Sequence, residues 1–289
     1  MPRFFAEVFT GLHGLGRSYH YNRLFIECDD SMADDYFILN CSFGKDSMAM
    51  LKTCVDKGYP IDEVCYIKIM YDKGISAEYP AHYQFIQDVG IPYITEKLGL
   101  KYHELNPKST LKDLFFKVFQ KGAYTGKHYG FPQRHCVKCN SELKIRTLKL
   151  FHTELREKDL KPVHYVGIAA DEQKRVLRGK YYGYLMPLAD LHITERDAMR
   201  ICMENGILSP LYECDCFNRI GCFFCPNCTI PQLRYLYRTS PELLKDLADL
   251  DKYSPFKFHS PHTATQLLRK FESEAREQTK LSDFIGRGD

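Results

Sequence analysis

The chain contains no apolar run long enough to cross a membrane, no internal repeat and no low-complexity linker. Its first residues also lack the apolar stretch of a secretory signal peptide. These absences argue against a membrane protein, a repeat array and an exported protein, so we expect a cytoplasmic protein. The 289 residues, 44% of them hydrophobic, suffice for one large domain, alone or with an appendage. A net charge of +3 is too small to indicate a partner.

Cysteine is present in an intermediate amount, since twelve residues are too few for a disulfide-stapled mini-protein and too many to overlook. Five are isolated in apolar patterns and are expected to be reduced core residues: Cys28, Cys41, Cys54, Cys65 and Cys202. Seven are clustered in the sequence: Cys136, Cys139, Cys214, Cys216, Cys222, Cys225 and Cys228. In a cytosolic protein, this clustering favours a metal or redox site over structural disulfides.

Two Cys-x-x-Cys pairs stand out in the clustered group, Cys136/Cys139 and Cys222/Cys225. Two thiolates at this spacing can bind one metal, so two pairs can supply the four sulfurs of a zinc site or an iron–sulfur cluster. A redox-active thiol pair and buried cysteines without a ligand are the alternatives. Further candidate ligands beside the second pair are Cys214, Cys216 and Cys228.

A second pattern joins an apolar run of strand length, 36–41, to the small and polar turn Ser42-Phe43-Gly44-Lys45-Asp46-Ser47. A helical pattern begins directly after it. The free backbone N–H groups of such a turn and the dipole of the following helix favour an anion, so the segment is expected to bind phosphate. It lacks the longer glycine-rich loop of a Walker A motif. An ordinary strand–turn–helix connection without a ligand is the alternative.

The residue types in this turn suit a nucleotide. Gly44 permits close approach of the backbone to an oxyanion. Lys45 supplies a mobile positive charge, and Asp46 can hold a metal ion or its water. Hydroxyl groups come from Ser42 and Ser47.

Strand-like and helical segments alternate after this turn. Expected helices cover 48–55, 80–98 with a break or delay at Pro92, and 143–155; expected strands cover 63–70, 102–105 and 163–169. This alternation predicts an α/β fold, with a mostly parallel twisted sheet covered by helices on both faces, as in Rossmann-like proteins. Ligands of such folds bind at the carboxyl ends of the strands, where the Ser42–Ser47 turn lies.

The sequence divides into three expected regions: an N-terminal helical segment at 1–35, the α/β domain with its cysteine-rich site at 36–230, and a helical extension at 231–289. In the extension, Ser240 and Pro241 are typical of a helix start, and a second helix is expected from about Thr265. Leucine stripes follow both and are expected to pack into a core.

The Ser42–Ser47 turn resembles the PP-loop of ATP pyrophosphatases, with Phe43 in the place of the first glycine. That variant is similar to the sulfate-activating and phosphoadenosine-phosphosulfate (PAPS) reductase-like branch of this adenine nucleotide alpha hydrolase-like superfamily. Four later stretches resemble elements of the same family in the expected order: Arg134–Cys139 with Lys144, Gly167–Arg175, Met186–Asp190 with Thr194–Asp197, and Ile220–Pro226. Together with the loop, the resemblance covers about 36–228.

The resemblance implies ATP and Mg²⁺ as ligands and assigns roles to residues. Lys45, Asp46 and Arg175 would be catalytic, and the loop would bind the nucleotide together with Gly167, Asp171 and Glu172. Read from the residues alone, the Asp171–Arg175 stretch is equally a solvated helix start. In the iron–sulfur branch of the family, a four-iron cluster is held at positions matching Cys136, Cys139, Cys222 and Cys225, with Cys228 adjacent. Zinc remains the alternative.

Two features separate the chemistries within the family. Lys45 and Asp46, which ATP-independent reductases commonly lose, are intact, and no cysteine follows Cys228 to act as the reductase nucleophile. We therefore expect an ATP pyrophosphatase that adenylates a substrate and releases pyrophosphate, in sulfur transfer or in the sulfur modification of DNA or tRNA. The alternatives are a PAPS or APS reductase and a metal-stabilised nucleic-acid-binding module with a vestigial nucleotide site. A sulfur-donor protein and a homodimer are further partners compatible with the resemblance.

The segment 138–180 bears on the nucleic-acid hypothesis. It holds eleven Lys and Arg against six Asp and Glu, a local excess of +5, with Tyr165 inside it and Tyr181 and Tyr182 directly after it. Basic residues among aromatic ones suit phosphate contact and base stacking. A charged helix face beside a nucleotide site is the competing explanation.

Overall fold

The computed structural model describes residues 33–134 and 138–285, with side chains through 278. The strands are β1 (Asp34–Asn40), β2 (Glu63–Ile67), β3 (Met70–Asp72), β4 (Ile75–Ser76), β5 (Tyr102–Leu105) and β6 (Leu160–Val166). The α-helices are α1 (Lys45–Asp56), α2 (Pro80–Phe85), α3 (Leu111–Phe116), α4 (Arg146–Arg156), α5 (Gln173–Tyr181), α6 (Pro187–Asp190), α7 (Glu195–Glu204), α8 (Ile230–Thr239), α9 (Pro241–Leu250) and α10 (Ala264–Ile285). Shorter helical turns are η1 (Ile86–Gly90), η2 (Tyr93–Lys97), η3 (Asn140–Ile145), η4 (Pro210–Glu213) and η5 (Asp251–Tyr253).

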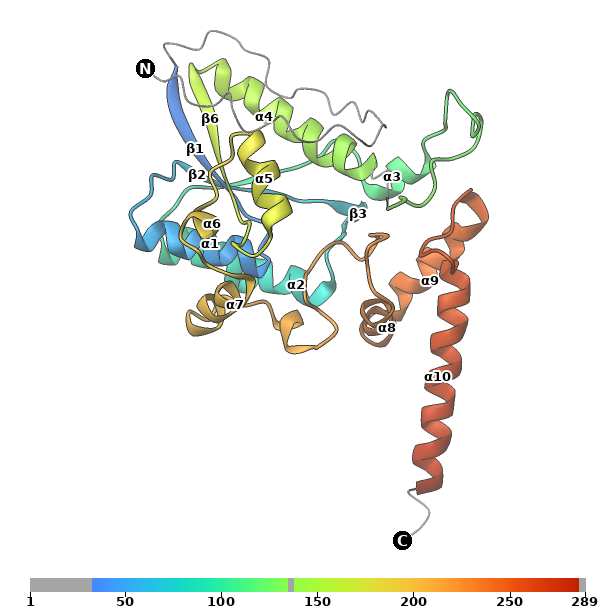
Figure 1. Ribbon diagram of the computed structural model, residues 1–289. Helices are drawn as coiled ribbons and strands as arrows, with labels where there is room; N and C mark the ends of the chain where they lie inside the picture. Colours follow the sequence, from blue (N-terminus) through green and yellow to red (C-terminus); the bar gives the residue numbers. More distant parts are fainter. Residues whose placement is uncertain (1–32, 135–137, 286–289) are drawn as a thin grey trace, which may run out of the picture. The chain divides into compact units, whose positions relative to one another are not determined.

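The central sheet has four parallel strands in the order β5-β2-β1-β6 (Figure 1). Alternate side chains enter separate cores, because neighbouring residues of a strand face opposite sides of a sheet. Leu39 and Val64 pack in the core that contains α1, whereas Ile38 and Cys65 pack with Phe151 of α4. The structure thus confirms the expected parallel α/β sheet with helices on both faces.

Two expected elements differ from the structure. The single strand expected over 63–70 is interrupted after Ile67, and Met70–Asp72 pairs instead in an antiparallel ribbon with β4. The break expected at Pro92 was wrong. The helical path continues from α2 through η1 and η2, whose wider π-type turns lie on either side of Pro92 and accommodate the missing backbone N–H.

The C-terminal helices share a core with the cysteine-rich segment. Leu233, Leu244 and Phe271, from α8, α9 and α10, are buried in one cluster with Phe223 and Phe224. Ser240 is the N-cap of α9, as expected, although its side chain makes no capping hydrogen bond. The helix expected in the N-terminal segment lies outside the described residues through 32, and 34–35 already belong to β1.

No helix in the described part of the chain is both long and apolar enough to cross a bilayer.

Candidate functional site

The turn between β1 and α1 is held in place from within. The Ser47 hydroxyl donates to the Gly44 carbonyl at 2.9 Å and accepts from the Ser42 amide at 3.2 Å. The Ser42 and Ser47 hydroxyls are 3.4 Å apart. Helix α1 begins at Lys45, with Gly44 as its N-cap, so the free N–H groups of the first helical turn lie at the carboxyl end of β1. This placement is the one that a phosphate cradle requires.

Phe43 carries the backbone strain of the turn. Its φ of 57° lies in the left-handed region that glycine adopts freely. Its ring is fully buried and packs edge-on against Tyr66, with centroids 5.1 Å apart. A Cβ on Gly90 would lie 2.5 Å from Phe43 Cδ1, so Gly90 makes room for the ring. Phe43 can therefore offer a ligand only its backbone, while its side chain fastens the loop to the core.

Lys45 is buried and bound by two carboxylates. Its ammonium donates to Asp46 Oδ1 and to Glu195 Oε2, both at 2.8 Å. Burial alone would lower the pKa of Lys45, but these two hydrogen bonds outweigh burial and raise it. The lysine is therefore a fixed positive charge at the amino end of α1, with only 5% of its side chain exposed.

Further carboxylates surround this charge. Burial raises the pKa of Asp46, and the nearby charges of Glu195 and Glu172 add to the rise against the opposing effect of Lys45. Asp171 Oδ1 accepts the Glu195 backbone N–H at 3.0 Å. Oxygen donors of this kind are the ligands that Mg²⁺ prefers, so these groups can hold the cation of a metal–nucleotide complex.

The segment after β6 contacts the turn directly. A Cβ on Gly167 would lie 2.9 Å from the backbone of Asp46, so a larger residue would displace α1. The Glu172 carboxylate accepts from the Ala169 amide at 3.3 Å and pairs with Arg175. The structure therefore brings Gly167, Asp171 and Glu172 to Lys45 and Asp46, whereas Arg175 is half-exposed and tied to Glu172.

Three site residues escaped the sequence interpretation. Glu195 lies in a stretch that the resemblance singled out, but no pattern paired it with Lys45. The Tyr212 hydroxyl accepts the Lys45 backbone N–H at 3.2 Å. His82 is buried between the Ser42 backbone and the Ser209 hydroxyl, 2.9 Å from its Nδ1, and burial lowers its pKa to about 4. Tertiary packing alone brings Tyr212 and His82 to the turn, so neither had a local signal.

The two cysteine elements meet in space. Arg134, two residues before Cys136, donates from Nε to the Pro226 carbonyl at 3.2 Å, which joins the first element to the second. The amides of Cys225 and Cys228 donate to the carbonyls three residues earlier, at 3.0 and 3.1 Å, so the second element folds as successive tight turns. Cys136 itself lies outside the described residues.

Cys139, Cys222 and Cys225 form the centre of this site. The pKa of Cys222 is raised well above its ordinary value, chiefly by burial and next by the negative charge of Glu78. The other two thiols raise this pKa further, whereas the positive charge of Lys144 lowers it. The pKa of Cys139 is raised by burial and by Cys225. These three are free thiols within each other's electrostatic reach, as a cysteine-ligated metal requires.

The other clustered cysteines point elsewhere. The Cys228 thiol donates to the Cys222 carbonyl at 3.3 Å and accepts from the Tyr79 hydroxyl at 3.5 Å. Burial raises the pKa of Cys228 to about 12, which favours the protonated thiol. Cys214 and Cys216 are hydrogen-bonded to each other. The pKa of Cys216 is raised to about 12, chiefly by burial and secondly by this hydrogen bond.

A chain of contacts connects the cysteine site to the turn. Phe43 packs on Tyr66, the Tyr66 hydroxyl donates to Glu78 Oε1 at 3.4 Å, and the charge of Glu78 acts on Cys222. The candidate metal site and the candidate phosphate-binding turn are therefore linked through the side chains of Phe43, Tyr66 and Glu78.

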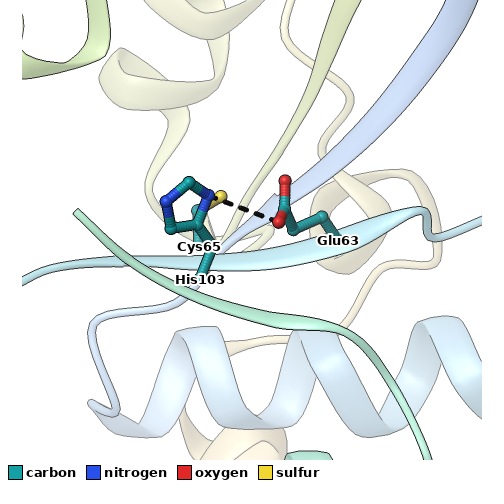
Figure 2. A group of neighbouring side chains, drawn as sticks. All are labelled: Glu63, Cys65 and His103. Atoms are coloured by element: carbon teal, nitrogen blue, oxygen red, sulfur yellow. Dashed lines mark ion pairs between the residues drawn. The ribbon is translucent and has the colours of Figure 1, made fainter. Parts of the chain in front are cut away.

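A third group of potential ligands comprises Glu63, Cys65 and His103 on β2 and β5 (Figure 2). Among the described residues, this is the one group of three whose ligand atoms all lie within 4.8 Å of one another. The Lys101 ammonium is 3.0 Å from Glu63 Oε1, His103 Nδ1 is 3.3 Å from it, and the Tyr36 hydroxyl donates to Oε2 at 3.2 Å. These partners already compensate the buried carboxylate, so the group is a polar network beneath α4.

The structure corrects one part of the nucleic-acid hypothesis. Tyr165, grouped with Tyr181 and Tyr182 in the basic segment, is only 1% exposed, and its ring packs against Phe37 and Tyr59. Tyr165 lies in β6, where alternate side chains enter the core, and cannot stack on a bound base. Tyr181 is 79% exposed.

Comparison with known proteins returns no matching family model and no matching curated protein. One similar solved structure is the U34-tRNA thiolase NcsA from Methanococcus maripaludis with its [4Fe-4S] cluster, at 14% identity and a TM-score of 0.41. The match covers 83% of this chain and 72% of that one. A likeness this distant carries no conclusion about function.

Proposed function

We propose that this protein is a PP-loop ATP pyrophosphatase of the PAPS reductase-like family, which adenylates an acceptor and releases pyrophosphate in a sulfur-transfer reaction. The observation that supports it most strongly is the buried Lys45. It lies at the amino end of α1 and the carboxyl end of β1, held by Asp46 and Glu195. A buried lysine beside free helix N–H groups is matched to a polyphosphate.

The reaction is attack of an acceptor oxygen on the α-phosphorus of ATP, with cleavage of the α–β phosphoanhydride bond. Charge then develops on the leaving pyrophosphate. The amides of the turn and Lys45 would stabilise that charge, and Asp46 and Asp171 would hold a Mg²⁺ ion, which would supply further positive charge to the phosphates. Catalysis of this kind is positioning and electrostatics, which a rigid turn supplies.

The residues that would hold the metal cofactor are Cys139, Cys222 and Cys225, with Cys136 as the fourth. Bound there by four thiolates, an iron–sulfur cluster would supply a redox-active or structural centre. The resemblance to the iron–sulfur branch of the family favours a cluster, and zinc, which the same thiolates could hold, is the alternative.

Metal content tests this assignment. The protein is purified anaerobically and its iron, sulfide and zinc are measured, alongside Cys222→Ser and a matched control, Cys54→Ser. Cys54 is a buried cysteine of α1 outside the site. We expect iron and acid-labile sulfide in the wild type and the control, and their loss in Cys222→Ser. Stoichiometric zinc without sulfide would contradict the cluster.

The ATP site is tested by comparing Lys45→Ala with Lys52→Ala. Both lysines belong to α1, but Lys52 forms an exposed pair with Asp56 one turn further along. We expect Lys45→Ala to lose ATP consumption by at least about 100-fold, as expected for loss of a major charge-stabilising group. Lys52→Ala should retain it. Equal activity of the two variants would refute the assignment of the turn.

A further inference from the structure

Helix α5 is a basic helix that directly follows the candidate site. Its nine residues include four basic side chains and no acidic one: Lys174, Arg175, Arg178 and Lys180. Arg175 is paired with Glu172. The other three form no ion pair with any residue of the described chain. An excess of unpaired positive charge on one short helix requires an anionic partner or solvent.

The orientation of α5 is fixed by its inner face. Gly179 is buried, and a Cβ there would lie 2.4 Å from Met186 Sδ, so the helix packs tightly against the body along this side. Residues on the opposite side are Lys174, Leu177, Arg178 and Tyr181, spaced three, four and seven positions apart. We call these four residues the α5 outer face.

Large apolar groups are unusually exposed on the α5 outer face. Leu177 is 69% exposed and Tyr181 is 79% exposed, the highest values among the exposed large hydrophobic residues of the described chain. Tyr181 is supported by Tyr182, with ring centroids 5.2 Å apart at 78°. One flat ring, supported from the side and flanked by unpaired cations, matches a ligand that carries both flat apolar faces and negative charge.

Position connects this face to the reaction. Glu172, at the start of α5, is close enough to Asp46 to raise its pKa, as described above. Tyr181 lies nine residues further, which is about 13 Å along a helix axis. That span corresponds to roughly four stacked bases. A strand stacked on Tyr181 could therefore extend to the turn at Lys45.

We propose that the α5 outer face binds single-stranded nucleic acid, which is the acceptor of the activated group. Tyr181 stacks on an unpaired base, Leu177 widens the apolar platform, and Lys174 and Arg178 contact phosphates. A duplex does not fit, because its bases are stacked on each other and present no face to the ring. The role of the bound strand as acceptor rests on the proposed function, whereas its binding to the α5 outer face does not.

Binding is measured by fluorescence anisotropy with labelled single-stranded RNA, single-stranded DNA of the same sequence, and the corresponding duplexes. Tyr181→Ala should weaken single-strand binding about five-fold or more, while Tyr181→Phe, which keeps the ring, should bind like the wild type. Replacing both Lys174 and Arg178 by Gln should weaken the salt dependence of binding. The negative slope of the logarithm of the binding constant against the logarithm of the salt concentration should become shallower by about 1.4, because each phosphate contact contributes roughly 0.7.

Matched controls are Met203→Ala, which removes an exposed apolar side chain from α7, and a Lys245→Gln/Lys270→Gln double variant on α9 and α10. Both should bind like the wild type. Preference for RNA or for DNA supports the proposal and identifies the acceptor. Unchanged binding by Tyr181→Ala, preference for the duplex, or no binding at near-physiological salt would overturn it.

ATP consumption by the same preparations, measured with sulfide and both with and without the oligonucleotide, separates the two proposals. Intact ATP consumption together with oligonucleotide binding that Tyr181→Ala leaves unchanged refutes the α5 outer face alone. Tyr181-dependent binding without ATP consumption in the presence of the oligonucleotide refutes the proposed enzyme and leaves the nucleic-acid surface standing.

Discussion

Replacing Phe43 by glycine should destabilise this protein, although glycine stands at this position in the PP-loops that the Ser42–Ser47 turn resembles. Glycine would relieve about 1 to 2 kcal/mol of left-handed strain at φ 57°. Glycine also loses more conformational entropy on folding than phenylalanine, which would destabilise the fold by about 0.5 to 1 kcal/mol. Loss of a fully buried phenyl ring costs about 3 to 5 kcal/mol. The net change in the free energy of unfolding is therefore a loss of about 3 kcal/mol.

Gly90 makes the same reasoning testable in a second way. In the wild type, Gly90→Ala places a methyl group 2.5 Å from Phe43 Cδ1 and should cost about 1 to 3 kcal/mol. In the Phe43→Gly background the methyl group enters the space left by the ring, so Gly90→Ala should become neutral or stabilising. The double-mutant cycle should therefore give a coupling of at least about 1 kcal/mol.

Chemical denaturation followed by far-UV circular dichroism measures these changes, because the chain has no tryptophan for fluorescence. Asp159→Gly is the matched control. Asp159 also has a positive φ, 55°, but its side chain is exposed, so the variant should stay within about 1 kcal/mol of the wild type. A Phe43→Gly protein as stable as the wild type, or additive effects at Phe43 and Gly90, would refute the view that the ring anchors the loop.

Two further predictions concern charge at the site. Glu195→Gln should lower the KM for ATP by about 3- to 10-fold with little change in kcat, because the half-exposed Glu195 carboxylate competes with phosphate for Lys45. The size of the effect follows from the roughly 1 kcal/mol that a partly exposed ion pair contributes. A raised KM would show that Glu195 helps to bind the nucleotide instead. Stability should fall as pH drops from about 6.5 to about 4, because His82 is neutral in the fold with a pKa of about 4 whereas the unfolded state gains a proton near 6.5. The loss from this group alone approaches about 3 kcal/mol, and acid titration of His82→Gln should show a correspondingly shallower slope.

How far the fold could be predicted depended on where its determinants lie. The strand–turn–helix around Ser42 was predictable because an apolar run, a small polar turn and a 3.6-residue repeat are all local signals. The continuous helical path through Pro92 was not, since π-type turns leave no mark in the residue pattern. The end of β2 at Ile67 was also missed, because Met70 and Tyr71 extend the apolar run while pairing in another ribbon.

The candidate site divides in the same way. Lys45 and Asp46 were recognisable as a motif, but Glu195 is 150 residues away from Lys45 and meets it only through the packing of α7 on α1. Tyr165 illustrates the opposite error. Counting aromatic residues along the basic segment ignored that β6 turns alternate side chains inward, so a buried tyrosine was grouped with an exposed one.

The identity of the products formed from Mg²⁺-ATP tests the central claim most directly. Anaerobically purified protein is incubated with ATP, sulfide and single-stranded RNA or DNA, and the nucleotide products are separated and quantified. Lys45→Ala serves as the control. The account predicts AMP and pyrophosphate in equal amounts, because the turn holds the leaving pyrophosphate, and their absence with Lys45→Ala. ADP and inorganic phosphate, or AMP formation that persists without Lys45, would contradict it.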